Sequence, residues 1–168
     1  LAQVSDTPTY VAMKLFLKDE RWAGVPFYLR TGKKMKNSYV RIDINFKPTP
    51  INLFGLQDDC CGLQNRIRFI IQPEEMICIR FGAKKPGGDM MLQPVNMSFS
   101  YKDAFHGVSL PAYARLLEDL FKGDQSLFAR EDGVESSWAI IDKYEELWEK
   151  DNGYLQYYTP GSSPMDLY

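Results

Sequence analysis

The sequence predicts an α+β fold, in which helices pack on one face of a large, mainly antiparallel sheet. Up to residue 101, several segments alternate apolar and polar residues with a period of two, which is typical of half-buried strands. Beyond that point the period changes to 3.6, which is typical of amphipathic helices. Because the strands all precede the helices, the order argues against alternating βαβ units and favours an α+β domain.

About six strands are expected, all before residue 102. The clearest alternation is the uninterrupted one that ends at Lys47. The fourth and fifth strands are expected to form a hairpin, because Pro73 between them suits a tight turn. The predicted strands span residues 9–17, 27–30, 39–47, 66–72, 76–81 and 95–101.

Two helices are expected after the strands. Pro111 lies in the first turn of the first helix, and Gly123 follows its last apolar residue. The second helix is expected to begin near Asp132 as N-cap, with Glu135 three residues later, and to end near Lys150. The apolar stripe that predicts the first helix, of about three turns, consists of Tyr113, Leu116, Leu117, Leu120 and Phe121.

The chain has 168 residues and a mass of 19.4 kDa, which suits one domain and is too short for a two-domain oxidoreductase. Residues 1–168 are therefore expected to form a single domain, with an extended tail at 159–168 that is rich in Gly, Ser and Pro. Hydrophobic residues make up 45% of the chain, enough to exclude disorder. The tryptophans Trp22, Trp138 and Trp148 are expected in the core.

Charge and cysteine content limit the partners and the compartment. The formal net charge of −2 argues against a nucleic-acid or acidic-membrane partner, and no apolar stretch approaches the ~20 residues of a transmembrane helix. The odd number of cysteines fits a reducing compartment, so a cytoplasmic location is expected. The neighbours Cys60 and Cys61 are expected as thiols, with a strained vicinal disulfide as the alternative.

The familiar catalytic motifs are absent from the sequence. His106 is the one histidine, which excludes a His-based metal cluster, and it is expected in a loop before the first helix. Neither a Walker A motif nor the G-x-G-x-x-G of dinucleotide-binding folds occurs. We therefore assign no catalytic residue and no metal site.

Four cations stand close together between residues 30 and 36: Arg30, Lys33, Lys34 and Lys36. A strand that ends at Arg30 and turns at Gly32 would project Lys33 from the sheet edge, where its ammonium could bind a phosphate. The alternative is a solvated cationic loop that discourages pairing at the sheet edge. The spacing alone favours neither interpretation.

The predicted sheet carries more apolar surface than one core needs. Helices cover one face, and the other face is left to water or to a partner. The residues that indicate this second apolar surface are Ile77, Ile79, Phe81, Met97 and Phe99, and a subunit interface is the natural hypothesis.

Residues 21–33, RWAGVPFYLRTGK, closely resemble the segment that opens the C-terminal domain of glucose-6-phosphate dehydrogenases. Further matching segments follow in the same order, at 71–75, 84–87, 112–117, 123–130 and 158–162. The resemblance implies a β+α domain that completes the site for glucose 6-phosphate and forms a homodimer or tetramer through its sheet face. It also implies a separate N-terminal Rossmann domain, absent from this chain, that binds most of the NADP and supplies the catalytic residues.

The resemblance assigns roles to a few residues. Lys33 and Gln72 match substrate-binding positions. The second basic substrate-binding residue of the family falls at Ser38 here, and Lys36 is the alternative if the loop is shifted. Arg30 matches a cation of an additional structural NADP site in animal members.

That additional site is expected to be absent from this chain. Arg80 matches a second of its cations, but Tyr39, Asp43 and Cys78 stand where other cations are expected.

The activity implied by the resemblance is oxidation of glucose 6-phosphate to 6-phosphogluconolactone with NADP, in the oxidative pentose phosphate pathway. The isolated chain is expected to be inactive. The alternative is a non-catalytic phosphosugar-binding or oligomerisation module.

Overall fold

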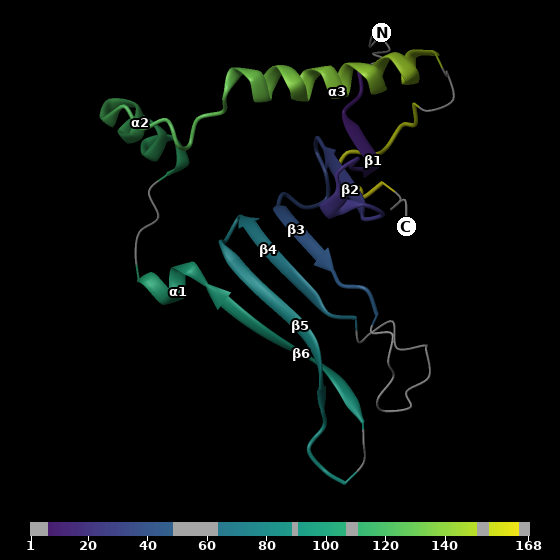
Figure 1. The fold of residues 1–168 in the computed structure, drawn as a ribbon, viewed down its shortest axis with the longest axis vertical. Coiled ribbons are helices and arrows are strands. Elements are labelled where there is room, and N and C mark those ends of the chain that lie inside the picture. Colours follow the sequence, from purple (N-terminus) through teal and green to yellow (C-terminus); the bar gives the residue numbers. More distant parts are fainter. Residues whose placement is uncertain (1–6, 49–63, 89–90, 107–110, 151–154, 165–168) are drawn as a thin grey trace. The chain divides into compact units, whose positions relative to one another are not determined.

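The computed structural model of the chain describes residues 7–48, 64–88, 91–106, 111–150 and 155–164 (Figure 1). The expectations for Cys60 and Cys61, and for the last four residues of the tail, lie outside these described residues. The elements are β1 (Tyr10–Phe16), the 3₁₀ helix η1 (Glu20–Trp22), β2 (Pro26–Gly32), β3 (Val40–Asn45), β4 (Arg66–Gln72), β5 (Met76–Lys84), β6 (Leu92–Ser100), α1 (Tyr101–Phe105), α2 (Ala112–Lys122) and α3 (Glu131–Lys150).

The α+β class is confirmed, and the chain divides into two compact units. Residues 1–37 and 113–168 form the first unit, and residues 38–112 form the second. The six described strands form two antiparallel sheets, with orders β1-β2 and β3-β4-β5-β6, in place of the single large sheet that was predicted. Strand β2 ends at Gly32, and Lys34, two residues later, has a φ of +49°. Coverage of one sheet face by helices stays a prediction.

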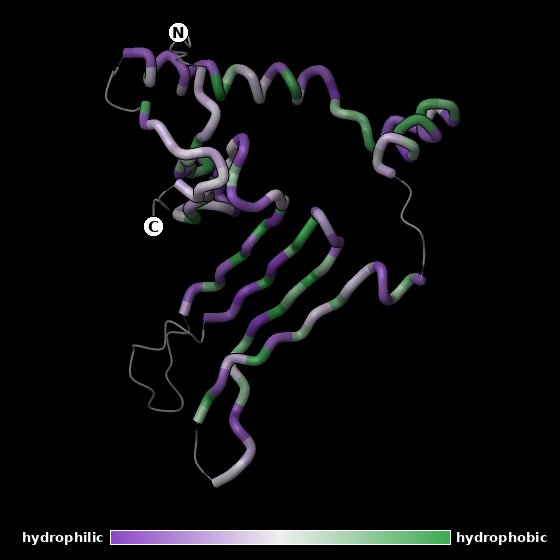
Figure 2. Tube along the Cα trace, turned by 180° about the vertical axis from the view of Figure 1, so that it is seen from behind, coloured by the Kyte–Doolittle hydropathy of each residue, from purple (hydrophilic) through white to green (hydrophobic). Residues whose placement is uncertain are grey.

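The four-stranded sheet has one apolar and one polar face. Across the strands, Ile44 lies opposite Ile67, which lies opposite Ile79, which lies opposite Met97. Figure 2 shows the resulting alternation of hydrophobic and hydrophilic residues along these strands. The predicted second apolar surface is confirmed in its pairing, because Ile77 faces Phe99 and Ile79 faces Met97.

The described residues bury very little apolar surface within this chain. Among them, Met13 is the one buried hydrophobic residue, at 9% exposure. Trp22 and Trp138 are exposed, so the prediction that they lie in the core is wrong for this chain, and Trp148 is half-buried. An apolar stripe predicts a face that becomes buried, but it does not indicate whether the same unit or another one buries that face.

The helices differ from the predicted ones at several points. Helix α2 begins at Ala112, so Pro111 precedes the helix and does not lie in its first turn. Helix α3 begins at Glu131, so Asp132 lies in its first turn, where its carboxylate accepts a hydrogen bond from the backbone N–H of Gly133. The short helix α1 was not predicted; the Ser100 side chain caps it, and it ends at His106, which has a φ of +47°. Neither α3 nor any other described helix combines the length and the apolar character of a transmembrane span.

Candidate functional site

The segment that carries Lys33, Lys34 and Lys36, here called the cationic loop, begins directly after the end of β2. The backbone N–H of Lys33 donates to the carbonyl oxygen of Thr9 at 2.8 Å, which makes Lys33 the first residue beyond the β1–β2 ladder. Strand β2 runs to Gly32, which pairs with Tyr10, so it continues two residues beyond the predicted end at Arg30 and does not turn at Gly32. An added Cβ at Gly32 would lie 2.7 Å from side-chain atoms of both Met35 and Tyr10, so a larger residue there would force these side chains to shift. The Lys33 side chain is exposed.

A turn near the C-terminus forms backbone hydrogen bonds with this loop. The carbonyl oxygen of Lys34 accepts a hydrogen bond from the N–H of Gly161 at 2.7 Å, and the N–H of Lys36 donates to the carbonyl oxygen of Ser162 at 3.1 Å. Exposed ammonium groups at positions 33, 34 and 36 therefore extend from a backbone that is fixed by a distant segment. Lys33 and Lys36, the two predicted substrate-binding cations of this loop, can thereby present positive charge to a phosphate, whereas no substrate role is assigned to Lys34.

The tail that was predicted to be extended begins with a turn instead. The N–H of Ser162 donates to the carbonyl oxygen of Thr159 at 3.0 Å, and Gly161 has a φ of +81°. Pro160 followed by a glycine in this conformation is the pattern of a type II turn. The Pro-Gly pair was therefore the signal in the sequence that could have located this turn, although not its contact with the cationic loop.

Tyr158, just before this turn, is a residue that sequence reasoning missed. Its hydroxyl oxygen lies 2.7 Å from the carbonyl oxygen of Lys33. The same oxygen lies 3.2 Å from the carbonyl oxygen and 3.1 Å from the hydroxyl of Thr9, and the Tyr158 ring packs edge-on against Tyr10. Tyr158 thus joins the start of β1, the end of β2 and the C-terminal turn.

The other predicted site residues lie in three places. Arg30 is half-buried within β2, opposite Ala12. Gln72 is exposed at the end of β4, where it pairs with Val40 at the start of β3, and Ser38 precedes Val40 by two residues. The structure therefore brings Lys33 and Lys36 into one loop, and brings Ser38 and Gln72 to one end of the four-stranded sheet.

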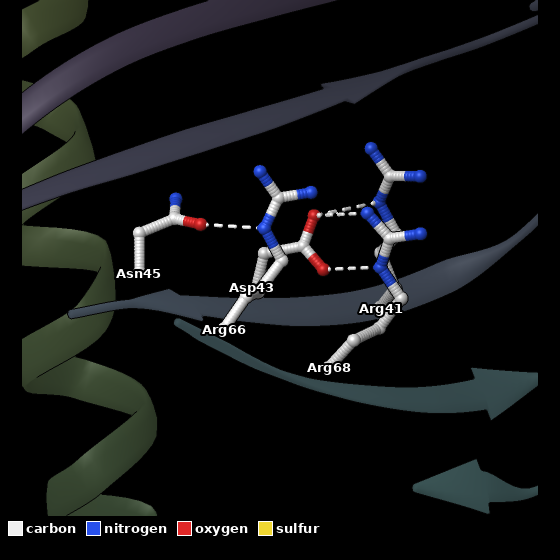
Figure 3. A network of polar contacts seen from close by, with 5 residues as sticks. All are labelled: Arg41, Asp43, Asn45, Arg66 and Arg68. Carbon is white, nitrogen blue, oxygen red and sulfur yellow. Dashed lines mark hydrogen bonds and ion pairs between the residues drawn. The ribbon is translucent and has the colours of Figure 1, made fainter. Parts of the chain in front are cut away.

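The polar face of the four-stranded sheet carries a network of charged groups (Figure 3). The Asp43 carboxylate accepts two hydrogen bonds from Arg68, and Arg41 lies 3.3 Å away as a second ion pair. Arg66 donates to the amide oxygen of Asn45 at 2.6 Å. Burial raises the pKa of the Asp43 carboxyl, but the hydrogen bond from Arg68 and the neighbouring positive charges outweigh burial and hold this pKa below 3.8.

A comparison with protein families explains the combination of an antiparallel sheet and a cationic loop. The family described as "Glucose-6-phosphate dehydrogenase, C-terminal domain" matches residues 1–166. The chain belongs to this family. The family resemblance that the motifs predicted is confirmed.

Individual glucose-6-phosphate dehydrogenases agree with this assignment. Glucose-6-phosphate 1-dehydrogenase of Borreliella burgdorferi is 40% identical over 163 residues, which are 97% of this chain and 34% of that protein. The enzyme of Mycolicibacterium smegmatis is 40% identical over 164 residues, which are 96% of this chain and 33% of that protein. The chain thus spans about a third of the length of the curated relatives that it matches.

Solved structures of glucose-6-phosphate dehydrogenases share the fold. One is a glucose-6-phosphate dehydrogenase in complex with its substrate glucose-6-phosphate; it matches with a TM-score of 0.78 and 29% identity, over 93% of this chain and 32% of that chain. Another is the enzyme of Mycobacterium avium, with a TM-score of 0.75 and 30% identity, over 96% of this chain and 33% of that chain.

Proposed function

We propose that this chain is the substrate-binding and dimerisation part of a cytoplasmic glucose-6-phosphate 1-dehydrogenase, which oxidises glucose 6-phosphate to 6-phosphogluconolactone with NADP. The match of residues 1–166 to the C-terminal domain family carries the proposal. The cationic loop at the end of β2 supports it, because a phosphosugar needs a positive group that reaches out from a fixed backbone. The non-catalytic module is not favoured, because the curated relatives are dehydrogenases.

The described part of this chain does not contain the dinucleotide-binding turn of a Rossmann domain. A Rossmann cradle places the pyrophosphate at a glycine-rich turn between a strand and a helix. Here β6 runs directly into the five-residue helix α1, and none of the other described strands leads through such a turn into a helix. We therefore assign most of the NADP binding and the oxidation step to an upstream domain.

The chain's own residues bind and orient the sugar phosphate. The Lys33 ammonium binds the phosphate or a nearby sugar oxygen, and the Gln72 amide is available for a sugar hydroxyl. We assign the second polar contact with the sugar phosphate to Lys36 or to Ser38.

The apolar face of the four-stranded sheet is assigned to assembly. Cross-strand pairs such as Ile79 with Met97 leave apolar side chains exposed along this face. A water-facing apolar patch of more than a few hundred Å² is uncommon in monomers. We assign this face to a homodimer or tetramer, with the dimer as the simpler symmetric assembly.

Lys33 and its neighbour Lys34 provide the experiment. In the full-length enzyme, Lys33→Ala removes a charge-assisted hydrogen bond of ~1.5–3 kcal/mol, which should lower kcat/KM for glucose 6-phosphate by about 10- to 150-fold. The KM for NADP should barely change. Lys33→Arg keeps the charge but changes the donor geometry, so it should recover only part of the loss.

Lys34→Ala is the matched control, because Lys34 is exposed in the same loop. It should change kcat/KM little when both variants are measured at one ionic strength, since exposed charges are screened by salt. Equal and small effects of the two substitutions would identify the loop as a merely cationic surface.

A further inference from the structure

The hydroxyl of Tyr158 reaches the backbone of the loop that carries Lys33, although 125 positions separate the two residues in the chain. Three oxygens lie within hydrogen-bond distance of this hydroxyl, which has only one proton to donate. The carbonyl oxygen of Lys33, at 2.7 Å, is the closest acceptor. The Thr9 hydroxyl, at 3.1 Å, can in turn donate to the Tyr158 oxygen. The Tyr158 hydroxyl can therefore donate to the Lys33 carbonyl and accept from the Thr9 hydroxyl at the same time.

The loop contains a conformation that needs such support. Lys34 has a φ of +49°, in the left-handed region that residues with a side chain rarely adopt. Each of the two peptide groups that flank Lys34 is held by a hydrogen bond from the C-terminal segment: the Lys33 carbonyl by the Tyr158 hydroxyl, and the Lys34 carbonyl by the Gly161 N–H. An unfavourable backbone conformation persists where the surrounding structure fixes it in this way.

The direction in which the Lys33 side chain leaves the sheet depends on this backbone. Its N–H is tied to Thr9, so its remaining freedom lies in the peptide that joins it to Lys34. If the bond from Tyr158 were lost, this peptide could rotate toward a commoner conformation and carry the side chain away from its present direction. A long, exposed lysine side chain binds an anion well only when its backbone directs it toward that anion, because a misoriented side chain loses more entropy on binding.

We propose that Tyr158 is a positioning residue for Lys33. Its hydroxyl orients the peptide group between Lys33 and Lys34 and thereby directs the substrate-binding ammonium. This proposal rests on the proposed function, because it requires that Lys33 binds the sugar phosphate. Tyr158 itself need not touch the substrate.

Tyr158→Phe in the full-length enzyme tests the proposal. The substitution keeps the ring against Tyr10 and removes only the hydroxyl. The KM for glucose 6-phosphate should rise about 3- to 10-fold, with kcat nearly unchanged, because one neutral hydrogen bond is lost and binding is weakened without a change in the reacting groups. Tyr157→Phe is the matched control: Tyr157 is the adjacent residue and is 78% exposed, and its substitution should leave KM unchanged.

A double-mutant cycle separates this proposal from the proposed function. Once Lys33→Ala has removed the ammonium, adding Tyr158→Phe should raise KM no further. If Lys33→Ala raises KM but Tyr158→Phe does not, or if the two effects multiply independently, the positioning role is wrong and the function assigned to Lys33 stands. A Tyr158→Phe variant that only lowers Tm, with an unchanged KM, also contradicts positioning. If Lys33→Ala leaves KM unchanged, the assignment of Lys33 fails, and the role of Tyr158 fails with it.

Discussion

Arg68 on β4 binds the Asp43 carboxylate on β3 with two hydrogen bonds, from Nε to Oδ1 at 2.6 Å and from Nη2 to Oδ2 at 3.1 Å. The two residues are direct cross-strand partners, and Arg41 adds an ion pair from the same strand as Asp43. Both side chains are partly buried, and a bidentate pair is more ordered than an ordinary surface salt bridge. This pair therefore stabilises the register in which Asp43 lies opposite Arg68.

We expect Asp43→Asn to destabilise the full-length protein in a pH-dependent way. At pH 7 the loss should be about 1–3 kcal/mol, because Arg68 keeps its charge and loses a charged acceptor. Folding lowers the pKa of Asp43, so the native state stabilises the ionised form. That stabilisation is present above 3.8, the ordinary pKa of the group, and is lost as the pH falls through the lower folded-state value. Denaturant titrations between pH 7 and pH 2 should show the wild type and the variant converging at the acid end.

Asp142→Asn is the control for a general effect of removing one negative charge. Asp142 is exposed on α3, so its substitution should not lower the free energy of unfolding at pH 7 by a comparable amount. If the difference in the free energy of unfolding between wild type and Asp43→Asn stays constant down to pH 2, the role given to the ionised carboxylate is contradicted.

The sequence predicted the strands well because alternation is a local signal. Its bounds for β4, residues 66–72, are those of the structure, and the expected hairpin at Pro73 joins β4 to β5. The alternation along β3 also separated Ile42 and Ile44, on the apolar face, from Asp43 on the polar face. Each of these features depends on neighbours within a few residues or on one short turn.

Contacts between distant parts of the chain could not be predicted in the same way. Nothing periodic in the sequence connects Tyr158 with Lys33, and the hydrogen bond between them exists only because the fold brings the C-terminal turn to β2. The division of the strands between two sheets likewise depends on which strands pair, and the alternation within a strand does not specify its partner. The resemblance predicted a substrate-binding role for Lys33, which stays a prediction, but it did not indicate the groups that hold the Lys33 backbone.

The apolar sheet face leads to a prediction about assembly. Met97 on β6 is 61% exposed and lies opposite Ile79, so Met97→Glu would place a carboxylate on the face assigned to the dimer. Burying that charge without a partner is unfavourable, and the dissociation constant of the full-length dimer should rise by about 10-fold or more. Sedimentation velocity over a range of concentrations measures the change.

Ser98→Glu provides the comparison, because Ser98 is the next residue of β6 and lies on the opposite face, paired with Cys78. It adds the same charge to the same strand and should leave the dimer intact. If both variants sediment as the wild type does, the apolar face is not the dimer interface.

Gly161 and Gly123 form a matched pair for testing the C-terminal turn. They have φ values of +81° and +71°, and an added Cβ meets no atom within 4 Å at either position. Alanine should therefore strain both backbones similarly, by ~1–2 kcal/mol. Only Gly161 donates to Lys34, so only Gly161→Ala should also disturb the Lys33 loop and raise the KM for glucose 6-phosphate, by about 2- to 5-fold. Steady-state kinetics and thermal unfolding of the two full-length variants measure the difference; an equal KM for both would mean that the turn does not position the loop.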